Sequence, residues 1–437
     1  MVNQKTVIVA IVLLLVGLGI GYGVGIAVAP VRTVTTTITA TAGVSVGLRG
    51  AVPIAALLPL TGTLSSFGEE NKVAIELAVS EVNDWLKSIG APWYLQLVVE
   101  DTATDPKTAL DKVRMLHGRG IKFFIGPMGS GEIREIKSYV DSNKLLVISQ
   151  SSTSPALSIP GDFILRYCPD DNVQGPAIAR VAFDAGVRYL IPVWLGNAWG
   201  DGLKDATVKA FLNLLKKYNE QGAVHEGLRI QEGGKEFSVE VAKLNDYVTE
   251  WVSKYGVDKV GVLLITYEEA IPFFTVASKY DILGKVKWFG SDGTAGNALL
   301  ASTKETAEFA NKVKFISTIA APSETPKFEY VKNHIVKTLG RVPAPYAYNS
   351  YDIVWTLAMA LAVVNDYNPE KVRDVLPKVV ENYYGASGWF KLNEAGDRAF
   401  ADYELWAIIK EGDKYVWKVV GVWRGATDSI DWKMKFY

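Results

Sequence analysis

Apolar and polar positions between Ile121 and Leu157 predict a strand, a helix and a second strand. The run IKFFI (121–125) is short and apolar, and Gly126-Pro127 ends it. GEIREIKSYVDS (131–142) carries its apolar residues at helical spacing, and LLVIS (145–149) has the composition of a buried strand. A strand–helix–strand unit of this length predicts two parallel strands joined by a right-handed crossover.

The same alternation of strands and helices continues on both sides of this unit. Apolar strand-like runs fall at 52–59, 93–101, 189–195, 227–231, 260–266 and 285–290, with amphipathic segments between them. A polar break, YCPDDNVQGP (167–176), divides the pattern, and 313–320 begins a return segment with helices at 327–339, 346–366 and 369–382. The segments after 388 alternate like antiparallel strands. We therefore predict two doubly wound α/β lobes, 51–168 with 317–392 and 169–316 with 393–437, around a cleft that closes by hinge motion.

The N-terminal stretch carries no charge between Lys5 and Arg32 and is long enough to cross a membrane. We expect residues 1–32 to form an uncleaved anchor; a signal segment cleaved near Ala27-Val28-Ala29 is the alternative. The threonine-rich run 33–50 reads as an extended linker. This order of segments predicts a globular body outside the cell.

The composition removes several classes of function. A net charge of −1 without a basic block argues against a nucleic-acid partner. Cys168 is the only cysteine, and the three histidines are scattered, so neither a metal site nor a catalytic triad is predicted. No phosphate-binding loop of the P-loop type is present. Asp101 and Asp105 suit a turn and a helix start better than a catalytic pair. We expect no enzymatic activity, no metal and no cofactor.

Small and hydroxylic residues fill the two loops that follow the strands of the opening unit. These loops are Gly126–Gly131 and Ser149–Ser154. Ligands of open α/β sheets bind at the carboxyl ends of the strands. Hydroxyls, backbone N–H groups and a helix N-terminus there form a seat for a small anion such as a carboxylate. Alternatively, the loops are ordinary turns and Ser130 caps the helix.

Five segments, in order, carry a resemblance to a known family. They are VPIAALLPLTGTLSSFGEENKVAIELAVSEVN, VEDTATDPKTALDKV, FFIGPMGSGE, VISQSSTSPAL and GSDGTAGN. From about Val52 to about Trp423 the chain resembles the type I solute-binding proteins of ABC importers, and among them the branched-chain amino-acid (Leu/Ile/Val) binding group. The resemblance implies a periplasmic-binding-protein-like type I fold, three hinge crossings, and a ligand trapped between the lobes without catalysis.

The resemblance also assigns residues to the ligand. It places the carboxylate seat in the two hydroxylic loops and further contacts in the first crossing and the second lobe. The assigned residues are Gly129, Ser130, Ser152, Thr153, Asp171, Trp199, Tyr267 and Asp292. It implies that Trp199 covers the ligand, that Tyr267 contacts the ammonium end and that Asp292 pairs with the ammonium. The plainer alternatives are a core aromatic for Trp199 and a solvated turn for Asp292.

The function implied is capture of an amino acid, branched-chain or otherwise aliphatic, for delivery to an ABC permease and its ATPase subunits. A small amide, a urea-like molecule or an aromatic acid is an alternative ligand. A ligand-sensing ectodomain of the same fold is an alternative role. The N-terminal span would hold the protein at the cell membrane.

Overall fold

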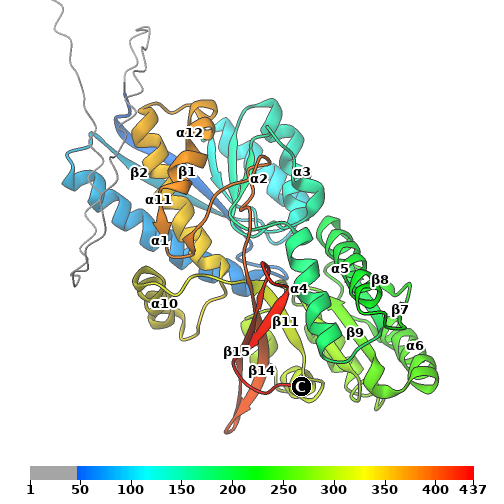
Figure 1. Cartoon of the computed structure of the whole chain (residues 1–437). Helices are drawn as coiled ribbons and strands as arrows, with labels where there is room; N and C mark the ends of the chain where they lie inside the picture. Colours follow the sequence, from blue (N-terminus) through cyan, green and yellow to red (C-terminus); the bar gives the residue numbers. More distant parts are fainter. Residues whose placement is uncertain (1–46) are drawn as a thin grey trace, which may run out of the picture. The chain divides into compact units, whose positions relative to one another are not determined.

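The first lobe is organised around a five-stranded parallel sheet with strand order β2-β1-β3-β4-β5 (Figure 1). The computed structural model describes residues 47–437, so the predicted anchor 1–32 and residues 33–46 of the linker lie outside the described residues. The strands are β1 Gly50–Leu58, β2 Trp93–Asp101, β3 Phe123–Ile125, β4 Leu146–Ser149 and β5 Ile164–Arg166. β3 and β4 pair in parallel, as the opening unit predicts.

Six helices cover this sheet, and the alternation of side chains along β1 divides them between its two faces. The helices are α1 Ser65–Ser88, α2 Pro106–Gly118, α3 Ser130–Ser142, α10 Pro326–Leu339, α11 Tyr346–Val364 and α12 Pro369–Glu381. Ile54 and Ala56 pack in one core with α1, α10, α11 and α12, whereas Ala55 and Leu57 pack in another with α2 and α3. Figure 1 shows α1 and α11 running together. Successive strand residues point to opposite faces, which gives each face its own core.

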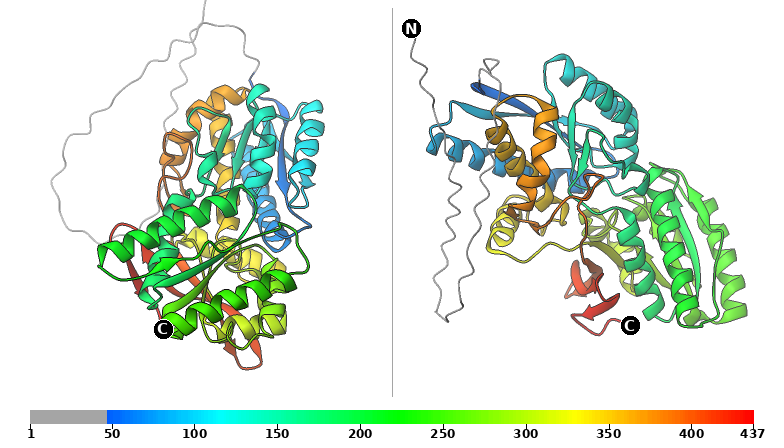
Figure 2. Two further views of the ribbon diagram at one scale, coloured as in Figure 1. Left: turned by 90° about the vertical axis from the view of Figure 1, so that its right-hand side faces the viewer. Right: turned by 45° about the horizontal axis from the view of Figure 1, so that its top comes forward.

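The second lobe contains a nine-stranded mixed sheet with strand order β16-β15-β14-β11-β10-β9-β6-β7, with β8 also paired to β6. Its strands are β6 Tyr189–Leu195, β7 Ala223–Val224, β8 Leu228–Ile230, β9 Val260–Ile265, β10 Lys287–Gly290, β11 Ile316–Ala320, β14 Tyr403–Glu411, β15 Lys414–Arg424 and β16 Ser429–Trp432. Its helices are α4 Asp171–Asp184, α5 Ala198–Lys217, α6 Ser238–Tyr255, α7 Ala270–Ala277, α8 Ala298–Ser302 and α9 Lys304–Lys312. β14 and β15 form the long antiparallel hairpin predicted for the tail, drawn in red in Figure 2. Two short strands, β12 Tyr384–Gly385 and β13 Gly388–Trp389, pair separately.

One predicted boundary needs correction. The division between 316 and 317 falls inside β11, which pairs in parallel with β10 and antiparallel with β14. The chain therefore returns to the first lobe after Ala320. The apolar run 313–320 extends the parallel order of the second sheet before the chain turns back. Passages between the two sheets then follow β5, β11 and β13, while the other predicted boundaries stay predictions.

Among the described residues, α11 is the helix whose length and hydropathy would suffice for a membrane span. Most of its apolar window is buried within the protein, against α1 and the first sheet. This burial accounts for its apolar composition, because a helix that is hydrophobic all round belongs in a core as well as in a membrane.

Candidate functional site

Hydroxyl groups link the two loops at the carboxyl edge of the first sheet. The Ser149 hydroxyl donates a hydrogen bond of 2.7 Å to the carbonyl oxygen of Pro127. The Ser130 and Ser152 hydroxyl oxygens lie 3.1 Å apart, and the Ser154 N–H donates to the Ser130 oxygen at 3.2 Å. All four serines are buried. The predicted anion seat is therefore a cross-linked pair of loops, in which Ser130 holds the second loop in place.

The helix cap of α3 is Gly129, so the alternative that assigns this cap to Ser130 is wrong. Ser130 is the first helical residue, and its side chain turns toward the second loop. The Gly129 N–H donates to a carboxylate oxygen of Glu132 at 2.8 Å. Burial raises the pKa of Glu132 to about 7. Because Glu132 already occupies the Gly129 N–H, that group is not available to a ligand carboxylate in this conformation.

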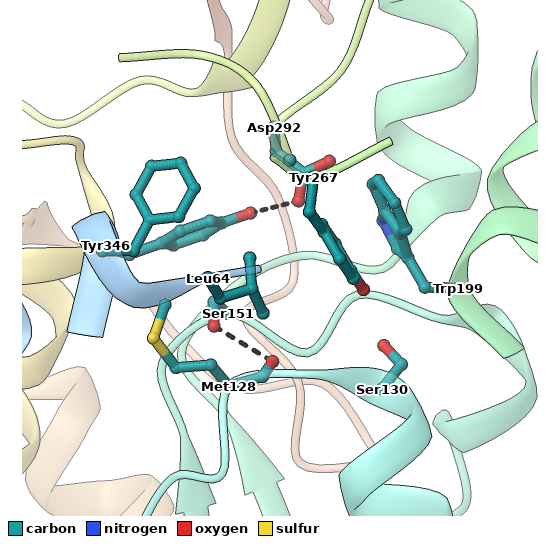
Figure 3. A pocket seen from close by; sticks show the side chains of 10 residues that line it. Leu64, Met128, Ser130, Ser151, Trp199, Tyr267, Asp292 and Tyr346 are labelled. Carbon is teal, nitrogen blue, oxygen red and sulfur yellow. Dashed lines mark hydrogen bonds between the residues drawn. The ribbon is translucent and has the colours of Figure 1, made fainter. Parts of the chain in front are cut away.

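A small cavity lies beyond these loops and takes its walls from both lobes (Figure 3). Its lining residues are Leu64, Phe67, Met128, Ser130, Ser151, Trp199, Tyr267, Asp292, Gly293 and Tyr346. Four of the eight predicted residues line it: Ser130, Trp199, Tyr267 and Asp292. Gly129, Ser152, Thr153 and Asp171 are buried behind this wall or have no side chain in it. The free volume is about 20 Å³, which is room for about one water molecule.

Asp292 supplies the anionic wall. It follows β10, and its side chain is 4% exposed, so it is not a solvated turn residue. The Tyr346 hydroxyl, at the start of α11, donates a hydrogen bond of 2.6 Å to one carboxylate oxygen, drawn as a dashed line in Figure 3. The other oxygen is buried without a hydrogen-bond partner among the described residues. Burial raises the pKa of Asp292 to about 6, against the lowering effect of the Tyr346 hydrogen bond.

A second buried carboxylate, Asp171, stands near the first. Neither of its oxygens makes a hydrogen bond of good geometry among the described residues, although the Thr153 hydroxyl lies close enough to act on it. Burial and then the charge of Asp292 raise the pKa of Asp171, and the Thr153 hydroxyl and then the cation Arg166 lower it. The Arg166 guanidinium is itself bonded to Asp397. Two close buried carboxylates with open oxygens favour the approach of a cationic group.

Trp199 and Tyr267 form an aromatic wall beside Asp292. Their ring centroids lie 4.5 Å apart with an angle of 15° between the planes, so the rings are stacked. Asn197 caps α5, and its side chain accepts a hydrogen bond from the Gly200 N–H at 2.8 Å, which fixes the helix start that carries Trp199. Trp199 is 2% exposed and lines the cavity, so it is both a core aromatic and a wall of the site. Aromatic faces of this kind attract an ammonium group.

Gly293 is the position where an added methyl group would disturb this wall most directly. A Cβ there would lie 2.5 Å from the carbonyl oxygen of Thr266, 2.7 Å from the Trp199 ring and 2.9 Å from the Tyr267 ring. We expect Gly293→Ala to lower the free energy of unfolding by about 1–3 kcal/mol, because overpacking forces the stack to shift. Urea unfolding and near-ultraviolet circular dichroism measure both effects. Gly118→Ala is the matched control, since a Cβ there meets no atom within 4 Å; equal values for the two variants would contradict the role of Gly293.

Direct hydrogen bonds join the lobes at the rim of the cavity. The Ser154 hydroxyl donates to the Ala198 carbonyl oxygen at 2.7 Å. On the other side, the Ser66 hydroxyl donates to Glu268 at 2.9 Å, and the Glu268 N–H donates to the Thr63 carbonyl oxygen at 3.2 Å. These bonds define a closed conformation of the cleft.

Six lining residues are not among the eight assigned ones: Leu64, Phe67, Met128, Ser151, Gly293 and Tyr346. Met128 and Ser151 nevertheless lie in the two predicted loops. Leu64 and Phe67 follow β1, whose carboxyl end lies at the same sheet edge as those of β3 and β4, so the edge rule applied to every strand would have indicated them. Tyr346 had no such signal. It begins an apolar core helix late in the chain, and only the fold brings its hydroxyl to Asp292.

Known proteins resemble this chain along most of its length. The family model of the receptor family ligand binding region matches residues 70–411. An uncharacterized protein of Methanocaldococcus jannaschii is 34% identical over 400 residues, covering 87% of this chain and 92% of that protein. Leu/Ile/Val-binding protein homolog 1 of Brucella abortus is 25% identical over 364 residues, covering 82% and 90%.

A solved structure agrees with these relatives in fold. The leucine binding protein of Thermotoga maritima superposes with a TM-score of 0.69 at 20% identity, covering 87% of this chain and 99% of that one. The family model and the superposed structure thus match the same part of the chain, which forms the two lobes and the cleft. The predicted type I fold is confirmed. The chain belongs to the receptor family of ligand-binding regions, in the group of type I periplasmic binding proteins that includes the Leu/Ile/Val-binding proteins of ABC transporters.

Proposed function

We propose that this protein is a membrane-anchored, extracellular substrate-binding protein that captures an amino acid between its lobes and delivers it to an ABC permease and its ATPase subunits. The ligand is branched-chain or otherwise aliphatic. The family relationship supports ligand binding rather than catalysis. The names of the Brucella relative and of the Thermotoga protein support the amino-acid class.

One observation carries the proposal: Asp292 lines the cavity as a buried carboxylate that makes no ion pair among the described residues. One of its oxygens also has no hydrogen-bond partner there, and a second buried carboxyl group, Asp171, lies behind it. Unpaired buried charges are costly, and an ammonium group would offset that cost. Opposite them, the Ser130 hydroxyl lines the first-lobe wall and suits a carboxylate, whereas the Ser151 hydroxyl in the same wall already donates to the Met128 carbonyl oxygen at 3.1 Å. A zwitterion matches both ends.

Ligand entry requires the lobes to part. The closed cavity holds about one water molecule, and an aliphatic amino acid is much larger. Ser154–Ala198 and Ser66–Glu268 are the bonds that must break on opening. On reclosure, Leu64, Phe67 and Met128 provide an apolar surface for the ligand side chain.

Isothermal titration calorimetry of the protein against the twenty amino acids, with benzoate, urea and acetamide added to the panel, tests the proposal. We expect one-to-one binding of aliphatic amino acids, led by leucine, isoleucine or valine. Binding of benzoate or an amide without any amino acid would overturn the ligand class. If none of the twenty amino acids binds, the proposed capture of an amino acid is overturned.

The affinity for the amino acid is expected to fall in acid. The ammonium requires an ionised Asp292, whose pKa in the free protein is about 6. Above this pKa the carboxylate is charged and binding is full; below it, a proton competes with the ligand, so affinity at pH 5 should be about tenfold lower than at pH 7.5. Calorimetry at both pH values measures this change. Burial also raises the pKa of Glu132 and Glu269, to about 7, so the titrating group is Asp292 only if Asp292→Asn removes the pH dependence. An affinity that is constant across this range would contradict the ammonium–Asp292 pair.

A further inference from the structure

A second concavity lies where two chain passages meet, apart from the cleft. It is a groove of about 690 Å³, lined by 321–324 after β11, by 389–391 and 398–402 between β13 and β14, and by side chains of β14 and β15. It shares no lining residue with the cleft cavity. We call it the connector groove.

Arg398 is the unusual residue of this groove. It lines the groove while being only 6% exposed. Its one hydrogen bond with a named partner goes from Nη2 to the Ser387 carbonyl oxygen at 3.2 Å, and its Nε is buried without a partner among the described residues. Its guanidinium carbon lies 4.6 Å from the centre of the Phe390 ring. Arg398 makes no ion pair with any residue of 47–437, although buried charges in proteins are normally paired.

Arg166, another buried arginine, shows the hydrogen bonds to a carboxylate that Arg398 lacks. Arg166 is equally buried and directs Nε and Nη2 to the two oxygens of Asp397, each at 2.5 Å. Arg398 follows Asp397 directly in the sequence and forms no salt bridge among the described residues. Burial lowers the pKa of Arg398 to about 10, against the raising effect of the buried Asp352, whose carboxylate is bonded to the N–H groups of Ala386 and Ser387. A guanidinium with free donors at the wall of a groove is a ready partner for a planar or tetrahedral anion.

The other charges of the groove do not cancel that of Arg398. The groups already engaged are Arg424 with Asp402 and Asp431, Lys433 with Glu324, and Glu404 with the indole N–H of Trp406. Burial raises the pKa of Glu404. Lys391, which also lines the groove, makes no ion pair among the described residues. The groove charges without an ion-pair partner among these residues are therefore two cations, Arg398 and Lys391, and one anion, Glu404.

Two exposed aromatic side chains line the same groove. Trp389 is 52% exposed and Phe400 is 48% exposed, and both belong to the passage that carries Arg398. Large aromatic rings left in water favour contact with an apolar or aromatic body. An arginine with open donors beside exposed rings offers two complementary features for one small molecule.

We propose that the connector groove is a second binding site, for a small aromatic anion whose charged group is held by Arg398 and Lys391 and whose ring packs on Trp389 or Phe400. The site is separate from the amino-acid cleft and does not depend on the function proposed for it. Occupying it gives the Arg398 guanidinium a counter-charge and covers the exposed rings.

Calorimetry of the full chain with phenyl phosphate tests the site. Inorganic phosphate and phenol, measured in the same way, test the charged group and the ring separately. We expect one-to-one binding of phenyl phosphate, about tenfold or more tighter than that of phosphate or phenol. Phosphate lacks the ring contact and phenol lacks the contact with the arginine. Arg398→Gln and Trp389→Ala should each weaken it about tenfold or more. Trp389→Ala alters an exposed side chain, so it reports on binding even if Arg398→Gln fails to fold.

Two controls locate the binding. Tyr94→Ala removes an exposed aromatic of β2 that does not line the groove, and it should leave the affinity unchanged. Asp292→Asn alters the cleft and should also leave it unchanged. The proposal is overturned if phenyl phosphate does not bind at about 10 mM, if Trp389→Ala and a folded Arg398→Gln both bind normally, or if Asp292→Asn abolishes binding, which would place the molecule in the cleft.

Discussion

Asp292→Asn should lower the affinity for an amino acid by about 2–5 kcal/mol, which is roughly 30-fold to several thousandfold. The asparagine has nearly the same shape and still accepts the hydrogen bond from Tyr346. What it loses is the charge at a site that is 4% exposed. A ligand ammonium enclosed there would lack its counter-charge, and a buried charge without a partner is costly. Calorimetry at pH 7.5 measures the loss.

The stability of the unliganded variant separates loss of binding from loss of folding. The folded-state pKa of Asp292, about 6, exceeds the ordinary value, so the folded protein holds its proton more tightly than the unfolded chain does. The stability that this residue contributes is present below about pH 4 and is lost as the pH rises through 6. At pH 7.5 the neutral asparagine should therefore unfold at the same or a higher denaturant concentration.

A matched control for Asp292→Asn is the neighbouring Ser291→Ala. The Ser291 hydroxyl is buried, has no hydrogen-bond partner among the described residues and does not line the cavity. Its removal should change the affinity by less than about threefold, since nothing is left unpaired. If Asp292→Asn binds the amino acid normally, Asp292 does not pair with the ligand ammonium.

The second large effect is expected at the ion pair between Arg166 and Asp397. The two side chains are 0% and 1% exposed, and Arg166 donates to both carboxylate oxygens at 2.5 Å. Asp397→Asn leaves the guanidinium charge buried without a counter-ion, and removal of one partner of such a pair typically costs about 3–5 kcal/mol. We expect the urea midpoint to fall accordingly, with an unchanged dependence on urea.

Arg166 also connects this pair to the ligand site. Its Nη1 donates to the carbonyl oxygens of Ser152 and Ser154, at 2.9 and 2.8 Å, in the second hydroxylic loop. Asp397 lies in the passage between β13 and β14, so the pair ties that passage to the loop. We therefore expect Asp397→Asn to weaken amino-acid binding as well, through displacement of the loop.

The control for this pair is Asp402→Asn, which breaks a bond between Asp402 and Arg424 with side chains 28% and 46% exposed. Exposed pairs contribute about 0–1 kcal/mol, because water and salt screen them. A loss from Asp397→Asn no larger than that from Asp402→Asn would show that the buried pair does not stabilise the fold.

Local patterns predicted the first three strands of the first lobe well because a turn residue marks the end of each: Pro59 follows β1, Asp101 ends β2 and Gly126 follows β3. Asp105 illustrates this: it caps α2 and accepts a hydrogen bond from the Thr108 N–H at 2.7 Å, as its place before Pro106 indicates. The boundary at 316 failed for a non-local reason. Whether a strand ends one lobe or begins the return depends on its partners, and β11 pairs with β10 and with the distant β14.

The strand–helix–strand unit and its two hydroxylic loops follow from the sequence alone, because apolar periodicity and turn residues act over a few positions. The family resemblance added Trp199, Tyr267 and Asp292 as wall residues. Only the tertiary structure decided how the loops are used: Ser130 braces Ser152 and Ser154, and Glu132 occupies the Gly129 N–H. It alone brought Tyr346 to Asp292 and left Arg398 without a salt bridge among the described residues. The physical reason is that hydrogen-bond satisfaction and burial depend on residues far apart in the chain, which local patterns do not contain.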